Sequence, residues 1–251
     1  MKTKKFLNII VFALALTIVI AASCTRSEKD QSQVSNEMAT IPQASSDING
    51  ALALRLDRKP DIPEPDWETF YKSVLKQHGV DDFSTDSLIS LMDSEKPGVK
   101  GFIALLLGHR QEFSAIPRLE EALSDEFPLV RIMATEALLK MGNRKGIKVL
   151  EDLCEEASKE FGHSNYQNTA YMSFATRVMA EAGEVSAIPY LRQLLTYDRS
   201  WGERLNALRS LKKLYEKDAA VLTDIASMQN DEHPQVRTEA ADIIARLQSR
   251  K

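Results

Sequence analysis

A pattern of apolar and small residues that returns at intervals of 31 to 41 residues limits what this chain can fold into. Pro-x-Val-[Arg/Lys] begins at Pro97, Pro128 and Pro234, and aligning the chain with itself on the valine gives five starts. The starts are Val99, Val130, Tyr171, Glu203 and Val236. Apolar or small residues recur four, seven and eight places after each start, which is the spacing of one face of an α-helix. The pattern therefore predicts a stack of similar helical units instead of a single globular core.

Each unit is predicted to be a helical hairpin, with a helix A, a short turn and a helix B. Residues 114–119 and 186–191 share the pattern Ser-Ala-Ile-Pro-x-Leu, which marks the A helices. The prolines before the start valines suit the first turn of helix B, where a backbone N–H has no partner in any case. Gly142 and Gly183 suit the ends of two B helices. The predicted hairpins span residues 86–110, 113–142, 144–183, 185–216 and 218–249.

A further helix is predicted before the first hairpin. Asp66 suits an N-cap, Phe70, Val74 and Leu75 lie on one face, and Gly79 suits a stop. We expect this helix, from Trp67 to His78, to cap the stack.

The first residues read as an export signal. Three lysines precede an apolar run from Phe6 to Ile20, and small residues 21–23 precede Cys24. Residues 21–24 resemble a bacterial lipobox, which implies that Cys24 is diacylated on sulfur, becomes the N-terminus and is then N-acylated. Two alternatives stay open: ordinary cleavage, because Ala21 stands where Leu is usual, and a retained anchor, although the run is short of the roughly 20 residues that a membrane-spanning helix needs.

The predicted organisation is a signal peptide at 1–23, a lipid-anchored flexible tether at 24–65 and a repeat domain at 66–251. The tether is rich in Ser, Gln, Asp and Pro and has little apolar periodicity. Its one exception, residues 51–56, is either a short helix or an extended strip. The expected location is the bacterial cell envelope, anchored by lipid to a membrane on the periplasmic or outer-membrane side.

The repeats resemble a known family, the HEAT-like repeats first described in phycobilisome lyase-type proteins. The resemblance rests on residues 130–142, which read Val-Arg-x-x-Ala-x-x-Ala-Leu-x-x-x-Gly, on Pro-x-Val-[Arg/Lys] and on Ala-Ile-Pro-x-Leu. It covers the chain from about Thr85 onward and implies an all-α fold, an α-α superhelix of about five hairpins. Tyr171 and Glu203 depart from the valine position and Met172 from the basic position. The resemblance implies little about activity, because such repeats serve scaffolds, lyases and a hydroxylase.

Charge argues against nucleic acid as a partner. The formal net charge is −4, and loss of the three leader lysines would leave 29 basic against 36 acidic residues. A chain with excess acid does not seek phosphate backbones. If Cys24 is lipidated, Cys154 is the only remaining thiol, and its helical spacing with Leu150 and Leu153 predicts a buried, unreactive side chain, the alternative being a reactive thiol.

The sequence favours a protein that is not an enzyme. The HEAT-repeat hydroxylases hold iron with His-Glu pairs, but none of the four histidines here is followed by Glu or has the spacing of metal ligands. Gly-rich phosphate loops and nucleophile motifs are also missing from the sequence. We therefore expect no metal, no cofactor and no catalytic residue.

A basic residue follows four of the five starts: Lys100, Arg131, Arg204 and Arg237. The series could be a ligand-binding ladder. The structural reading is favoured, because the resemblance implies pairing with acids of the same or a neighbouring repeat, and Asp93, Asp125, Asp198 and Asp231 lie six or seven residues upstream. Cutting one such pair is expected to loosen a hairpin junction.

Two surfaces are candidates for binding a protein partner. The first is the solvent face of the B helices, predicted two, six, nine and ten places after each start, with a basic cluster of Arg177, Arg209 and Lys213 that suits an acidic peptide. The positions assigned to this face are Ile132, Glu136, Leu139, Lys140, Arg177, Ala180, Glu181, Leu205, Arg209, Lys212, Lys213, Asp242 and Arg246. An ordinary solvated face is the alternative.

The second candidate is an aromatic group in the turns of the third and fourth hairpins: Phe161, His163, Tyr166, Tyr197 and Trp201. Stacked repeats would bring these rings to one edge, and aromatic side chains give contact area at low entropic cost. The alternative for Trp201, which stands at the proline position, is packing beneath its turn.

The sequence therefore predicts a membrane-tethered scaffold for protein partners, including an acidic or extended peptide segment. An accessory subunit or lyase-like chaperone that holds a small ligand in the groove is the alternative, and a mechanical spacer is a third possibility.

Overall fold

The computed structural model describes residues 66–93, 96–161, 166–197 and 200–249. The regular structure of these residues is helical throughout, with eleven α-helices, short 3-10 turns and no strand. Contacts divide the chain into two units, Met1–Phe83 and Ser84–Lys251. The predicted signal peptide, Cys24 and the tether lie outside the described residues.

The described part of the first unit is helix α3, Trp67–Gln77. Asp66 is its N-cap, and the Thr69 N–H donates to Asp66 Oδ1 at 3.1 Å. Gly79, with φ of +85°, follows the helix end. The predicted helix and its two end signals are confirmed, whereas its role as a cap of the stack stays a prediction.

The second unit is an α-α superhelix of five hairpins. In chain order the pairs are α4 (Thr85–Leu91) with α5 (Pro97–Arg110), α6 (Ile116–Glu121) with α7 (Pro128–Lys140), α8 (Ile147–Lys159) with α9 (Tyr166–Glu181), α10 (Ile188–Leu195) with α11 (Trp201–Leu214), and α12 (Val221–Ser227) with α13 (Pro234–Gln248). Each pair falls within a predicted hairpin, except that α4 begins one residue before the first of them.

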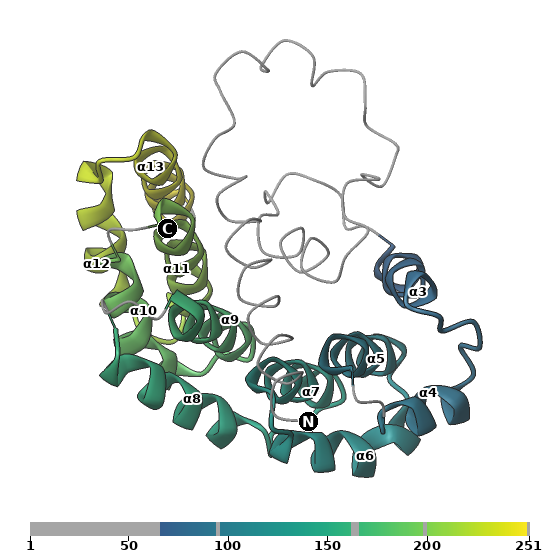
Figure 1. Cartoon of the computed structure of the whole chain (residues 1–251). Coiled ribbons are helices and arrows are strands. Elements are labelled where there is room, and N and C mark those ends of the chain that lie inside the picture. Colours follow the sequence, from purple (N-terminus) through teal and green to yellow (C-terminus); the bar gives the residue numbers. More distant parts are fainter. Residues whose placement is uncertain (1–65, 94–95, 162–165, 198–199, 250–251) are drawn as a thin grey trace. The chain divides into compact units, whose positions relative to one another are not determined.

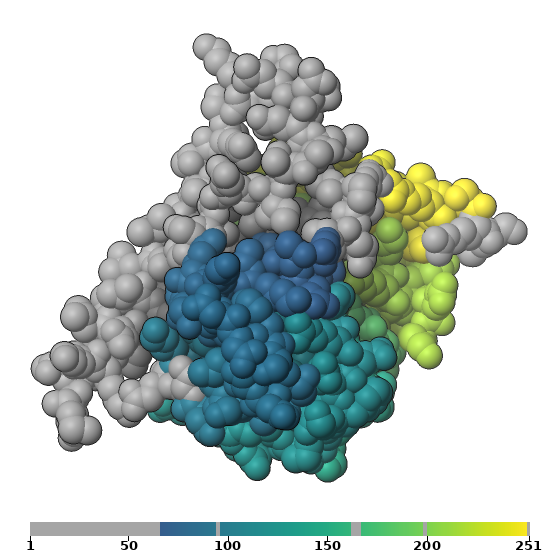
Figure 2. Space-filling view, turned by 90° about the vertical axis from the view of Figure 1, so that its right-hand side faces the viewer, coloured from purple at the N-terminus to yellow at the C-terminus, as the bar shows by residue number. Residues whose placement is uncertain are grey.

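The hairpins form two layers within this unit (Figure 1). The A layer consists of α4, α6, α8, α10 and α12, and the B layer of α5, α7, α9, α11 and α13. Successive B helices contact one another along the whole stack, and the B layer lines its concave side (Figure 1). Seen from the end that carries α4, the atoms of the first hairpins form one continuous surface (Figure 2).

The repeated spacing explains how the two layers pack. Pro97, Pro128 and Pro234 are the first residues of α5, α7 and α13. The residues four places after the starts are all buried, and most are small enough for helices to approach closely. At Gly108 the helices come so close that a Cβ would lie 2.5 Å from Ala137 Cα.

Part of the predicted solvent face of the B helices is wrong. Ile132, Glu136, Ala180 and Leu205 are at most 5% exposed. The sixth positions of the second and third repeats face each other across two B helices, because Arg177 of α9 pairs with Glu136 of α7. These positions therefore lie at contacts between helices. A helical wheel drawn for a single helix assigns them to solvent because it does not include the neighbouring helix.

None of the helices described combines the length and the apolar character that crossing a bilayer requires.

Candidate functional site

A network of ion pairs crosses three helices of the B layer. Glu136 of α7 binds Lys140 Nζ at 3.5 Å and Arg177 Nη2 of α9 at 3.1 Å. Arg177 Nη1 also binds Glu181 at 3.1 Å, and Glu181 accepts from Lys213 Nζ of α11 at 2.7 Å. The network thus joins three cations and two carboxylates in the order Lys140, Glu136, Arg177, Glu181 and Lys213.

Burial and pairing act in opposite directions on this network. Burial disfavours the charge of Arg177, but the Glu136 and Glu181 carboxylates outweigh it and raise the pKa of Arg177. Burial likewise raises the pKa of Glu181, but Arg177 and Lys213 more than offset this, and the net shift is downward. Arg177 and Glu181 are therefore both charged at neutral pH, and by formal charge the network holds three basic and two acidic side chains.

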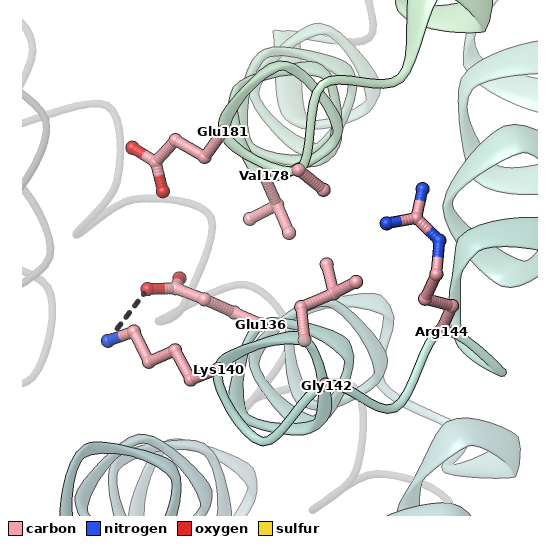
Figure 3. Close-up of a pocket in the computed structure, with 8 residues that line it drawn as sticks. Glu136, Lys140, Gly142, Arg144, Val178 and Glu181 are labelled. Atoms are coloured by element: carbon pink, nitrogen blue, oxygen red, sulfur yellow. Dashed lines mark ion pairs between the residues drawn. The ribbon is translucent and has the colours of Figure 1, made fainter.

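A small cavity of about 220 Å³ opens beside the network, between α7 and α9. Leu139 and Val178 give it apolar walls, and Glu136, Lys140 and Glu181 give it charged ones. Val178 points into the space between the helices, while Glu181 and Arg144 lie on opposite sides of it (Figure 3). The volume is below the roughly 300 Å³ at which small-molecule pockets begin, and it suits a single side chain of a protein partner better than a cofactor.

The predicted basic cluster is a mixed-charge network in the structure. Arg177 and Lys213 come together through Glu181, whereas Arg209 pairs in the other direction with Glu239 of α13 at 3.4 Å. The sequence assigned Glu136 and Glu181 to the same face but did not predict that they pair with these bases. Their contact with a partner stays a prediction.

The aromatic group is partly assembled. The Phe161 and Tyr197 rings lie 5.5 Å apart, but Tyr197 is only 2% exposed and belongs to the core of a hairpin junction. Trp201 stacks on His233 at 4.3 Å, with the rings 2° from parallel, which agrees with packing beneath the turn. His163 and the Tyr166 side chain lie outside the described residues.

The basic residues after the starts mainly join consecutive hairpins. Lys100 pairs with Asp125, which precedes the next B helix. Arg204 makes the same contact with Asp231, through Nε at 2.7 Å and Nη2 at 2.8 Å. Arg237 Nη1 donates to the Asp231 and Glu232 carbonyls at 2.8 and 2.9 Å. The predicted structural role is confirmed for Lys100 and Arg204, with acids of the following repeat.

Two buried groups lie away from the network. Cys154 is fully buried as predicted, and burial raises its thiol pKa to about 12, so it stays protonated and unreactive at neutral pH. Glu203 stands at the start of its repeat and is 6% exposed, and burial raises its pKa to about 7 against a lowering hydrogen bond from Ser173. Its replacement of the start valine was the signal in the sequence. Within the described ranges, no three His, Cys, Asp or Glu side chains are placed to hold a metal ion.

A family model described as HEAT repeats matches residues 85–161. The match runs from α4 to α8, and the hairpins beyond it repeat the same architecture. Repeats of this kind are commonly scaffolds for protein partners. Comparison with curated proteins gives no match.

Proposed function

We propose that this protein is a membrane-tethered scaffold of the bacterial cell envelope that binds a protein partner along its B layer, with no chemistry of its own. One observation carries the proposal: the B helices bring a charged network and an open cavity together at the same seam between α7 and α9. A cavity with apolar walls beside charges suits a partner side chain with a polar backbone around it. The similarity of residues 85–161 to HEAT repeats supports the same reading.

The partner that fits best is an extended segment with acidic residues. The network has one more cation than carboxylates, and the cation at its α11 end, Lys213, is 45% exposed. An acidic side chain that approaches Lys213 would gain a charge-assisted contact there. The sequence of residues 21–24 supports the tether, because an acylated Cys24 with several chains would hold the scaffold at a membrane.

Site-specific photocrosslinking tests the proposed surface. A photoreactive residue at Leu139, in the cavity wall, should capture a discrete protein from envelope extracts. The same residue at Asp152, an exposed side chain of the A layer, is the matched control. Lys213→Glu should weaken the capture at Leu139 several-fold. Equal capture at both positions, or a small ligand that copurifies and blocks capture, would contradict the proposal and favour the ligand-holding alternative.

The tether has a separate test. Intact mass spectrometry of the protein from membranes should show cleavage before Cys24 and the mass of an acylated cysteine, and Cys24→Ala should move the protein into the soluble fraction. An unmodified Cys24, or an uncleaved N-terminus, would contradict lipidation.

A further inference from the structure

Two of the four junctions between hairpins share one device, a base on a B helix that meets an acid from the next hairpin. Lys100 with Asp125 and Arg204 with Asp231 both follow it, with side chains at most 14% exposed. Each aspartate also accepts a backbone N–H two residues on, from Phe127 and His233 respectively, at 2.9 and 2.8 Å. The backbone hydrogen bond therefore holds the aspartate in place independently of its ion pair with the base.

Arg131 of α7 has the same position in its repeat but makes no such pair with an acid that precedes the next B helix. Its Nε is buried without a hydrogen-bond partner, and among the residues that the structure describes its guanidinium forms no ion pair. The sequence gives the reason, because no Asp or Glu occurs between Phe161 and Ala180, where the next hairpin would supply one. The junction between the second and third hairpins therefore has the base but lacks the corresponding acid.

A cavity of about 270 Å³ opens beside Arg131. Arg131 lines it with Tyr171 of α9 and Leu153 of α8. The Tyr171 hydroxyl accepts from Gln167 Nε2 at 2.6 Å, and burial raises its pKa, so the hydroxyl keeps a proton that it can donate. The cavity thus offers two donors, the Arg131 guanidinium and the Tyr171 hydroxyl, beside an apolar wall, and two carboxylates, Glu126 and Glu156, also line it.

We propose that this cavity binds the side-chain carboxylate of an aspartate from the protein partner, in the role that Asp125 and Asp231 have at two other junctions. The inference rests on the proposed function in that a protein supplies the carboxylate, but it uses a different surface from the cavity between α7 and α9. Guanidinium groups bind carboxylates with two parallel hydrogen bonds, as Arg204 does with Asp231.

The two carboxylates that line the cavity limit how much negative charge a ligand can carry into it. Glu126 and Glu156 line it with exposed side chains, and neither forms an ion pair with Arg131. Their repulsion grows with the charge of the ligand, so a carboxylate enters at a smaller cost than a phosphate dianion.

NMR of the Arg131 Nε–Hε resonance in the whole protein tests the proposal, with assignment by Arg131→Lys. The probes are N-acetylated, C-amidated Gly-Asp-Gly, its Gly-Asn-Gly counterpart, acetyl-Gly-Asn-Gly with a free C-terminus, and inorganic phosphate. The aspartate peptide should shift the resonance saturably and bind at least tenfold more tightly than the amidated asparagine peptide.

Equal shifts with both amidated peptides would overturn the proposal. Tighter binding of phosphate or of the free C-terminus would overturn the choice of an aspartate side chain. Arg131→Gln should abolish binding of the aspartate peptide, measured by calorimetry, while Arg237→Gln, the same position in the last hairpin, should leave it unchanged. Binding that survives Arg131→Gln would also overturn it. Crosslinking at Leu139 tests the scaffold function independently. The aspartate site can therefore fail its test while the scaffold function passes, and the reverse.

Discussion

Among single residues, Glu203 makes the clearest prediction. Its carboxyl is buried at a position that holds valine in three of the five repeats, and its pKa is about 7 in the folded state against 4.5 in a model peptide. The folded protein therefore keeps a proton that the unfolded chain releases, and stability falls as pH rises from about 4.5 to about 7. Glu203→Gln removes this ionisation and should flatten that part of the profile.

Urea unfolding at pH 4.5 and pH 8 measures the effect. The wild type should lose up to about 3 kcal/mol more than Glu203→Gln between the two values, from the size of the pKa shift. Glu216→Gln, at an exposed position, is the matched control and should follow the wild type. A Glu203→Gln profile parallel to that of the wild type would show that Glu203 is ionised in the fold.

Between elements, α5 comes close to the backbone of α7 at Gly108. Alanine in place of a helical glycine normally stabilises a helix by about 1 kcal/mol. Here a Cβ would lie 2.5 Å from Ala137 Cα and 2.6 Å from its Cβ, so the helices must separate. Gly108→Ala should lower the free energy of unfolding by about 1–2 kcal/mol, since overpacking costs about 1–3 kcal/mol.

Gly101→Ala is the matched comparison on the same helix. A Cβ there meets only the Met133 side chain, which is flexible enough to move aside. Its free energy of unfolding, from urea titration, should stay within about 1 kcal/mol of the wild type. If Gly108→Ala proves the more stable of the two variants, the approach of α5 to α7 is looser than described.

The sequence could predict these elements because their signals are local. Pro128 and Gly142 mark where α7 begins and the chain turns, and the alanines four places after four of the five starts mark the buried face. The partners of charged residues could not be predicted in the same way, because Lys100 and Asp125 are 25 residues apart and Arg204 and Asp231 are 27. Glu136 was assigned to solvent for this reason, since its partner Arg177 comes from another hairpin.

Across the whole repeat array, each hairpin is held mainly by its neighbours, so stability should differ along the chain. In α7 nine of 13 residues are buried, whereas in α13 only Val236, Ala240, Ile243 and Leu247 are buried among 15. Hydrogen exchange by mass spectrometry should show α13 exchanging about tenfold faster than α7 or more. Equal protection of the two helices would mean that the hairpins open as one cooperative unit.

A base on one hairpin and an acid on the next determine which hairpins can form an ion pair where they meet. Arg131 leads into a hairpin without the complementary aspartate, while Asp231 belongs to a hairpin that would accept it. A shortened protein in which the fifth hairpin directly follows the second would reunite a guanidinium with a carboxylate. Deleting two whole repeats in this way would create a matched seam where the natural chain has a mismatched one.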